Sequence, residues 1–221
     1  MTKKIKTRDP DFCDAFKILL GARATSLSDA ARVSSDIIEE VRKNGDKALI
    51  KLTKKFDGLD LTAKDLIVDL NEIDEATSKI SPDEYDSLRF AADRITSFHL
   101  RQMPENFEYV DDAGIKMGMR WSPVDSVGLY VPGGTASYPS SVLMNAIPAS
   151  VAGVPRRVIV VPQTRNVISP LVLVAARLSG VEEIYRVGGA QAIAALAYGT
   201  ETITSVDKIV GPGNSFVAAA K

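Results

Sequence analysis

Glycines and amide or phenol side chains recur in the second half of the chain, each time next to a short apolar segment. These apolar segments cover residues 127–131, 158–161, 184–187 and 208–210. The loops after them are Pro132-Gly133-Gly134-Thr135, Pro162-Gln163, Gly188-Gly189-Ala190-Gln191 and Gly211-Pro212-Gly213-Asn214. Adjacent glycines let a ligand approach the backbone closely, and a helix that starts directly afterwards presents free N–H groups and the positive end of its dipole. Such loops suit the phosphates or ribose of a nucleotide.

A tight turn from strand to helix also favours Gly and Pro without any ligand. For a single loop the turn is the simpler interpretation, whereas three Gly-rich loops on one rim favour a nucleotide site. The chain has neither a G-x-G-x-x-G fingerprint after a strand nor a G-x-x-x-x-G-K-[ST] phosphate loop. A nucleotide would therefore be held in an unusual way.

Helical patterns separate the four apolar segments, at residues 140–152, 169–179 and 189–197, and a further helix starts at Asn214. Strands separated by single helices at this spacing predict right-handed crossovers, so all four strands should be parallel. Loops at the carboxyl ends of parallel strands form a binding crevice. The predicted fold class is α/β, with an incomplete Rossmann-like parallel-sheet domain at residues 123–221.

Residues 1–122 are predicted to be mainly helical and to form part of a first α/β domain that downstream chain would complete. Charged residues are dense up to about residue 110 and thin out from Trp121. Asn44-Gly45 should stop one helix, and Phe56 should face inward from the next. The expected helices are 9–20, 28–43, 46–56, 71–79 and 82–102, with a short strand at 66–70 and a hairpin of 107–110 and 115–121.

Composition excludes several classes of protein. The 221 residues are 45% hydrophobic and 25% charged, with a net charge of -1, so no global field favours nucleic acid or an anionic membrane. Gly, Pro or charge breaks every apolar stretch well before the roughly 20 residues that a membrane helix needs. One cysteine cannot form a disulfide within the chain, and a cytoplasmic location is expected.

His99 and Cys13 are single residues of their types and have no partners at catalytic or metal-ligand spacing. A lone histidine beside Phe98 at the end of a helix is more often a surface or boundary residue than a base or metal ligand. Cys13 lies in a helical segment far from any Gly-rich loop, with no second histidine to activate it.

Three segments, GLYVPGGTASYPSSVLMNAIPASVAGV, RVGGAQAIAALAYGTETI and VDKIVGPGNSFVAAAK, resemble the signature of the histidinol dehydrogenase family. The likeness extends more loosely to the amino-terminal helices. It implies an aldehyde-dehydrogenase-like (ALDH-like) architecture and a zinc-dependent, cytoplasmic homodimer. Members of that family oxidise L-histidinol to L-histidine through a bound aldehyde, with two NAD⁺ used in turn, as the last step of histidine biosynthesis.

Carried over residue by residue, the resemblance implies three NAD contacts. They are Tyr130 of GLYVPGG, Gln191 of GGAQA and Asn214 of GPGN. A phenol and two amides could bind ribose or phosphate oxygens. The alternatives are a half-buried core tyrosine at position 130 and a helix N-cap at position 214.

The chain is about half the usual length of the family. By the resemblance, the zinc ligands (a Gln and a His from a Q-x-x-H motif, an Asp and a His from the partner subunit) and a Glu–His acid–base pair lie beyond Lys221. We therefore assign no catalytic and no metal-binding residue here, and expect the isolated chain to lack dehydrogenase activity and to associate with itself. The alternative is a truncated, non-catalytic module that binds a nucleotide or packs against a partner. An unrelated phosphate-binding α/β domain would show no preference for NAD.

Overall fold

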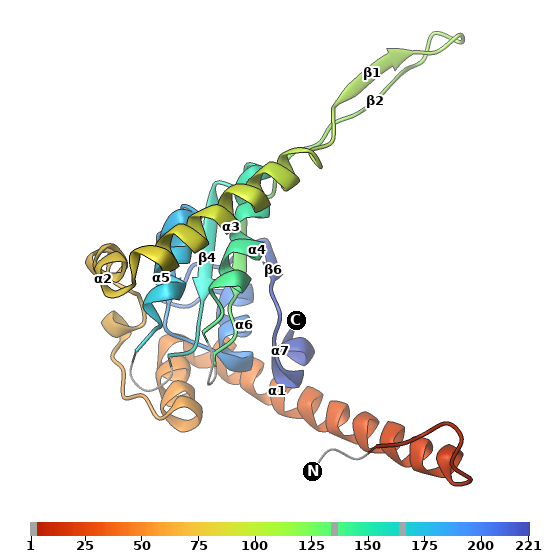
Figure 1. Cartoon of the computed structure of the whole chain (residues 1–221), viewed down its shortest axis with the longest axis vertical. Coiled ribbons are helices and arrows are strands. Elements are labelled where there is room, and N and C mark those ends of the chain that lie inside the picture. The colour runs from red at the N-terminus through yellow and green to blue at the C-terminus, as the bar shows by residue number, and fades with distance from the viewer. Residues whose placement is uncertain (1–3, 134–136, 164–166) are drawn as a thin grey trace.

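Four short parallel strands form the sheet at the centre of the described chain (Figure 1). The computed structural model describes residues 4–133, 137–163 and 167–221. The strands are β3 (Ser126–Tyr130), β4 (Arg156–Val160), β5 (Glu183–Tyr185) and β6 (Lys208–Val210), in the order β5-β4-β3-β6. Gly128 of β3 pairs in parallel with Val158 of β4 and with Ile209 of β6. The predicted parallel α/β sheet is confirmed.

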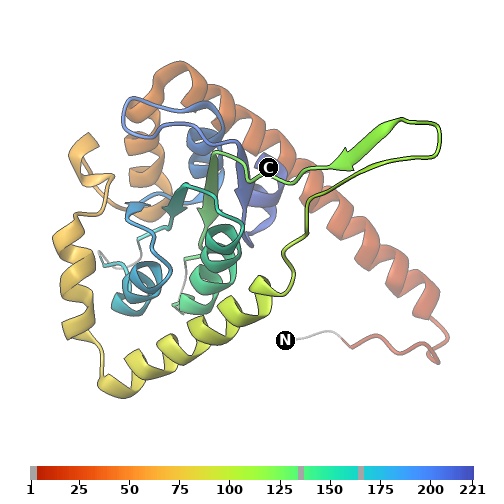
Figure 2. The ribbon, with the colours of Figure 1, turned by 90° about the horizontal axis from the view of Figure 1, so that it is seen from above.

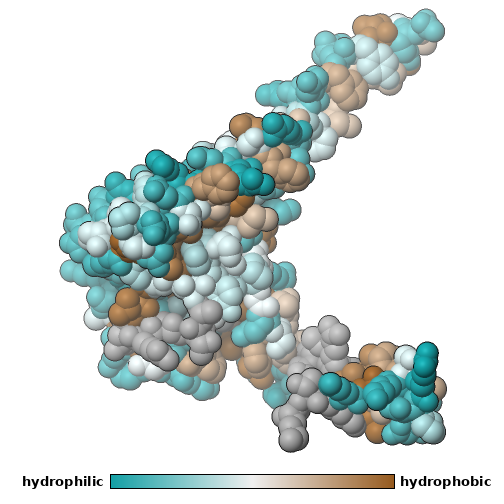
Figure 3. All heavy atoms as spheres, in the orientation of Figure 1, coloured by the Kyte–Doolittle hydropathy of each residue, from teal (hydrophilic) through white to brown (hydrophobic). Residues whose placement is uncertain are grey.

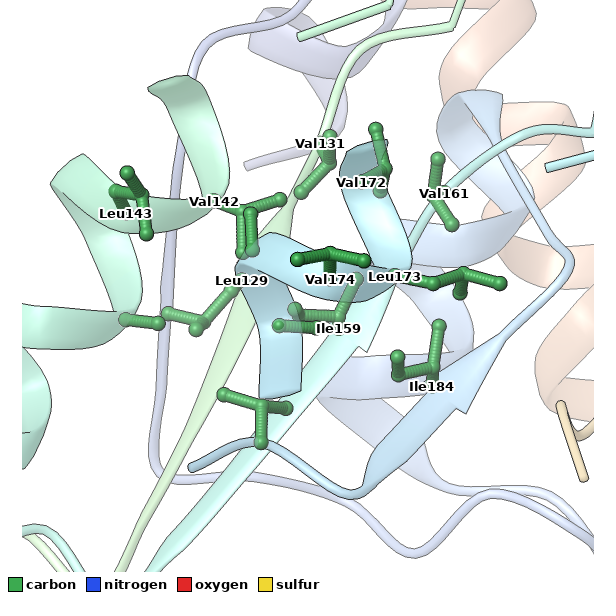
Figure 4. Close-up of a cluster of buried hydrophobic side chains, with 14 of the residues drawn as sticks. Leu129, Val131, Val142, Leu143, Ile159, Val161, Val172, Leu173, Val174 and Ile184 are labelled. Carbon is green, nitrogen blue, oxygen red and sulfur yellow. The ribbon is translucent and has the colours of Figure 1, made fainter. Parts of the chain in front are cut away.

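Helices cover both faces of this sheet (Figure 2). On one face, Leu129, Ile159 and Ile184 pack against α4 (Pro139–Val151) and α5 (Pro170–Leu178), as Figure 4 shows. The opposite face packs against α6 (Gly189–Tyr198). Because successive strand residues point to opposite faces, an unbroken apolar strand supplies both layers.

Close packing of α6 on the sheet depends on Gly128. A Cβ at this position would collide with the side chain of Leu196 of α6. Two further helices, α1 (Phe12–Asp57) and α7 (Ser215–Ala220), pack against α6 on the same side of the molecule. The carboxyl end of α1 is thereby placed beside the loops that follow the strands.

Helix α1 is longer than the sequence predicts, because residues 21–27 continue it and no break separates the two expected helices. No proline occurs in this stretch. The expected stop at Gly45 is a kink: Gly45 has φ 51° and ψ −132°, and the helix resumes on its far side. The Asp46 N–H, which the kink frees, donates to Oε2 of Glu201 at 2.8 Å.

Two shorter helices, α2 (Leu70–Ala76) and α3 (Pro82–Leu100), follow as predicted, with single 3₁₀ turns at Ala63–Asp65 and Thr77–Lys79. Oδ1 of Asp69 accepts from the Asn71 N–H at 2.7 Å and caps α2. Ser81 and Glu84 form a capping box at the start of α3.

The predicted strand at residues 66–70 is wrong. The structure has one antiparallel bridge there, between Ile67 and Tyr185. Asp69 starts a helix instead, and the carbonyl of Ile67 accepts from the guanidinium of Arg186 at 2.6 Å. The bridge is held by the Arg186 N–H to the Leu66 carbonyl and the Val68 N–H to the Ile184 carbonyl, and the pairing ends there because α2 begins at Leu70.

The predicted hairpin is confirmed as β1 (Phe107–Val110) and β2 (Lys116–Met119), which pair antiparallel. It projects from the body, as does the amino-terminal part of α1 (Figure 1). Apolar side chains are exposed along the hairpin and the residue that follows it closely (Figure 3): Phe107, Tyr109, Val110, Ile115, Met117, Met119 and Trp121. Among the described helices, none has the length and apolar character required to span a membrane.

Candidate cofactor site at the strand ends

A cavity of about 490 Å³ lies at the carboxyl ends of the strands. Tyr130, Gln191 and Asn214, the three residues singled out from the sequence, all line it. They come from β3, the first turn of α6 and the start of α7, respectively. The structure thus brings together side chains that are far apart in the sequence. The volume and the mixture of apolar walls with a few polar groups are typical of small-molecule sites.

Tyr130 has its ring in the core and its hydroxyl at the cavity. Its side chain packs in the cluster beneath α6, and the residue is 4% exposed. The hydroxyl oxygen accepts a hydrogen bond from the Gly189 N–H at 3.1 Å. Burial raises the pKa of the Tyr130 phenol, the Gly189 N–H opposes that shift, and the negative charge of Asp57 adds to it. The phenol therefore stays neutral at physiological pH.

Gln191 is buried at the first turn of α6, where it is 2% exposed. Gly189 has φ +65°, and a Cβ there would collide with Oε1 of Gln191. The glycine is thus required both by the backbone conformation and by the amide that lies against it. The amide is held at the wall of the cavity by this packing.

Asn214 is the N-cap of α7. Its Oδ1 accepts hydrogen bonds from the N–H groups of Phe216, at 3.1 Å, and Val217, at 3.0 Å. The capping role considered from the sequence is therefore present. Because the carbonyl oxygen caps the helix, the Nδ2 amide is the part of the side chain that can serve a ligand in the cavity.

Two of the loop glycines make room for a proline. A Cβ at Gly133 or at Gly188 would collide with the ring of Pro162, which lies between the two loops. The sequence-based interpretation, that adjacent glycines admit a ligand to the backbone, is therefore incomplete, because these two glycines admit a neighbouring loop. Gly134 and Thr135 lie outside the described residues.

The carboxyl end of α1 forms a wall of the cavity that the sequence analysis missed. Phe56, which was expected to face inward, is 50% exposed and lines the cavity together with Asp57 and, from α7, Phe216. Partial desolvation raises the pKa of the Asp57 carboxyl. In the sequence, this wall corresponds to the end of a predicted helix at Phe56-Asp57-Gly58. We interpreted that segment only as the point where the helix stops.

Opposite ends of two helices meet this cavity. Helix α6 begins at Gly189, so its positive end and its first-turn N–H groups, of which that of Gly189 is bonded to Tyr130, are on one side. Helix α1 ends at Asp57, with Gly58 in the left-handed conformation, so its negative end is on the other. The cavity is therefore electrically polarised from α6 toward α1.

Comparison with known proteins identifies the family of the chain. The family model described as histidinol dehydrogenase matches residues 21–221. The chain belongs to the histidinol dehydrogenase family. The histidinol dehydrogenases of Ruegeria pomeroyi and Rhodospirillum rubrum are each 54% identical over all 221 residues, which cover 51% of each relative. The crystal structure of histidinol dehydrogenase from Elizabethkingia anophelis matches with a TM-score of 0.82 and 38% identity, over 86% of this chain and 44% of that one.

The chain spans about half the length of the curated histidinol dehydrogenases that it matches. Within residues 4–133, 137–163 and 167–221, no three His, Cys, Asp or Glu side chains are placed to hold a metal ion. His99 lies on α3 with its ring edge-on to Phe98, and Cys13 is exposed on α1. Neither lines the cavity.

Proposed function

We propose that the strand-end cavity binds NAD, and that the chain serves the NAD-dependent oxidation of L-histidinol to L-histidine. The observation that carries the proposal is the convergence of Tyr130, Gln191 and Asn214 on one cavity at the start of α6. The resemblance to histidinol dehydrogenases supports a zinc-dependent cytoplasmic homodimer. The activity belongs to the whole protein, of which this chain would provide the cofactor side.

The residues of the cavity fit a dinucleotide. The N–H groups in the first turn of α6 that follow Gly189 suit the pyrophosphate. Gln191 and the Nδ2 amide of Asn214 can donate to phosphate or ribose oxygens, and the exposed rings of Phe56 and Phe216 offer faces for an aromatic base.

NAD, when bound, supplies the hydride acceptor for the oxidation. The residues described here bind and orient it. Tyr130 is neutral and already accepts the Gly189 N–H, so its hydroxyl hydrogen can be donated to a ligand oxygen. Zinc has no candidate site among the described residues, and no step of this proposal passes through a metal.

Calorimetric titration of the 221-residue chain with NAD⁺ tests the proposal. The double variant Tyr130→Ala/Asn214→Ala should lose binding, because it removes two polar walls of the cavity. The matched control is Tyr109→Ala/Asn71→Ala, which removes the same residue types from exposed positions outside the cavity and should bind like the wild type. Absence of binding by the wild-type chain, or equal binding by both double variants, would contradict the proposal.

A further inference from the structure

Asp57 is the acidic side chain in the wall of the cavity, and the proposed function gives it no role. It is the last residue of α1, where the carbonyl end of the helix adds partial negative charge. It lines the same cavity as Tyr130, a proposed cofactor contact.

The cations next to Asp57 in sequence have other partners. The ammonium of Lys54 pairs with Asp60 at 2.8 Å, and that of Lys55 lies 5.1 Å from the centre of the Phe56 ring. Among the described residues, no ion pair to Asp57 is formed within 4.0 Å. This side of the cavity therefore stays negative, opposite the positive start of α6.

We propose that Asp57 determines cofactor specificity: its carboxylate accepts hydrogen bonds from a ribose diol and rejects a ribose that carries a 2′-phosphate. This inference rests on the proposed function and adds the choice between NAD and NADP to it. A carboxylate forms strong, charge-assisted hydrogen bonds with two adjacent hydroxyls. A phosphate monoester, with a charge near −2, would meet both the carboxylate and the negative end of α1.

The polarity of the cavity also sets the direction of the cofactor. The pyrophosphate faces the N–H groups at the start of α6, and the adenosine ribose faces Asp57. The adenine then lies beside Phe56, whose exposed ring directly precedes Asp57. One helix end thus provides both the acceptor for the ribose and a surface for the base.

Calorimetric titrations with NAD⁺ and NADP⁺ test the inference on the wild-type chain, Asp57→Asn and Asp60→Asn. Wild type should prefer NAD⁺ by about tenfold or more, since like charges in direct contact are costly. Asp57→Asn should weaken NAD⁺ binding and bring the two dissociation constants close together. Asp60→Asn, which removes an exposed acid outside the cavity, should keep the wild-type preference.

A second measurement shows whether the carboxylate is where the inference needs it. In ¹³C-tyrosine NMR, Asp57→Asn should lower the pKa of Tyr130 because the neighbouring negative charge is removed, and the same spectra show whether the variant is folded. An unchanged preference for NAD⁺ over NADP⁺ in folded Asp57→Asn overturns the inference.

The outcomes separate the two proposals. If the wild type binds NAD⁺ and Tyr130→Ala/Asn214→Ala does not, while Asp57→Asn keeps the NAD⁺ preference, the proposed function stands and the role of Asp57 falls. If the wild type binds NAD⁺ and NADP⁺ equally, the role of Asp57 also falls. If it binds neither, both proposals fall.

Discussion

The phenolic oxygen of Tyr130 accepts a hydrogen bond from the Gly189 N–H, 3.1 Å away. This contact joins the last residue of β3 to the first residue of α6. It satisfies one of the N–H groups that a helix start leaves without a partner. The same atom therefore contributes to the stability of the fold and faces the proposed cofactor.

The variant Tyr130→Phe separates these two roles. We expect it to lower the free energy of unfolding by about 1 kcal/mol, because the Gly189 N–H loses its protein acceptor where water has access from the cavity. Urea denaturation measures the change. Tyr198→Phe, in which the ring is half exposed, is the control and should change stability little. Equal effects of the two variants would show that the Tyr130 contact contributes nothing specific.

Substitution by alanine should lower the stability of the chain at Gly45 and raise it at Gly21. Gly45 lies at the kink of α1 with φ 51°, and a Cβ there would collide with the carboxylate of Glu201. Gly45→Ala should destabilise the chain by about 1–3 kcal/mol. Gly21 is a helical position with no described atom within 4 Å of an added Cβ, so Gly21→Ala should stabilise by up to about 1 kcal/mol. The same sign for both variants in urea denaturation would refute the prediction.

Arg156 links β4 to β5 and to the loop before β6. Its guanidinium donates to both carboxylate oxygens of Glu183, at 3.0 and 2.7 Å, and to the carbonyls of Thr204 and Ser205. Lysine cannot reproduce this fork, so Arg156→Lys should cost about 2 kcal/mol of stability. Arg89→Lys, at the exposed pair with Asp86, should cost less than about 0.5 kcal/mol in the same thermal and urea measurements. Similar losses at both sites would contradict this ranking.

Tyr185 should make the fold sensitive to alkali. Burial raises the pKa of its phenol above the ordinary 10.0, and the nearby charge of Glu183 adds to the shift. The unfolded chain then loses this proton at lower pH than the native chain does, so the stabilisation is complete below pH 10.0 and declines as pH rises above it. The slope from this one group is at most about 1.4 kcal/mol per pH unit.

Urea denaturation at several values from about pH 9 to about pH 11 checks the alkaline loss. Tyr185→Phe should have lower stability at neutral pH, because its hydroxyl donates to Glu183, but a shallower decline above pH 10.0. Tyr109→Phe, on the exposed hairpin, should decline like the wild type. An equal slope for wild type and Tyr185→Phe would mean that another group causes the loss.

Most of the fold could be predicted from local sequence patterns. The apolar runs around Leu129 and Ile159 are short and bounded by Gly and Pro, which specifies buried parallel strands in sequence alone. The break predicted at Gly45 is present as a kink, with helix on both sides of it. The predictions failed at residues 21–27, which continue α1 without a break, and at residues 66–70, where the start of α2 after Asp69 leaves a single bridge at Ile67.

In the candidate site, too, residues at the ends of local elements could be predicted, whereas residues placed by distant packing could not. Tyr130, Gln191 and Asn214 were found because each lies at the end of a strand or the start of a helix, and parallel topology places such ends together. Asp57 and Phe56 were missed because they belong to a helix far earlier in the chain. Only the packing of α1 on α6 and α7 brings them to the cavity, and no local pattern encodes that packing.

The ring of Pro162 fills the space that a side chain would need at both Gly133 and Gly188. A larger residue at position 133 or 188 is compatible with the fold only if position 162 becomes smaller in the same step. We therefore expect a larger residue at either glycine position to require a compensating change at position 162. A library that randomises position 133 or 188 alone should therefore return glycine, and larger residues there should appear only together with a smaller residue at position 162.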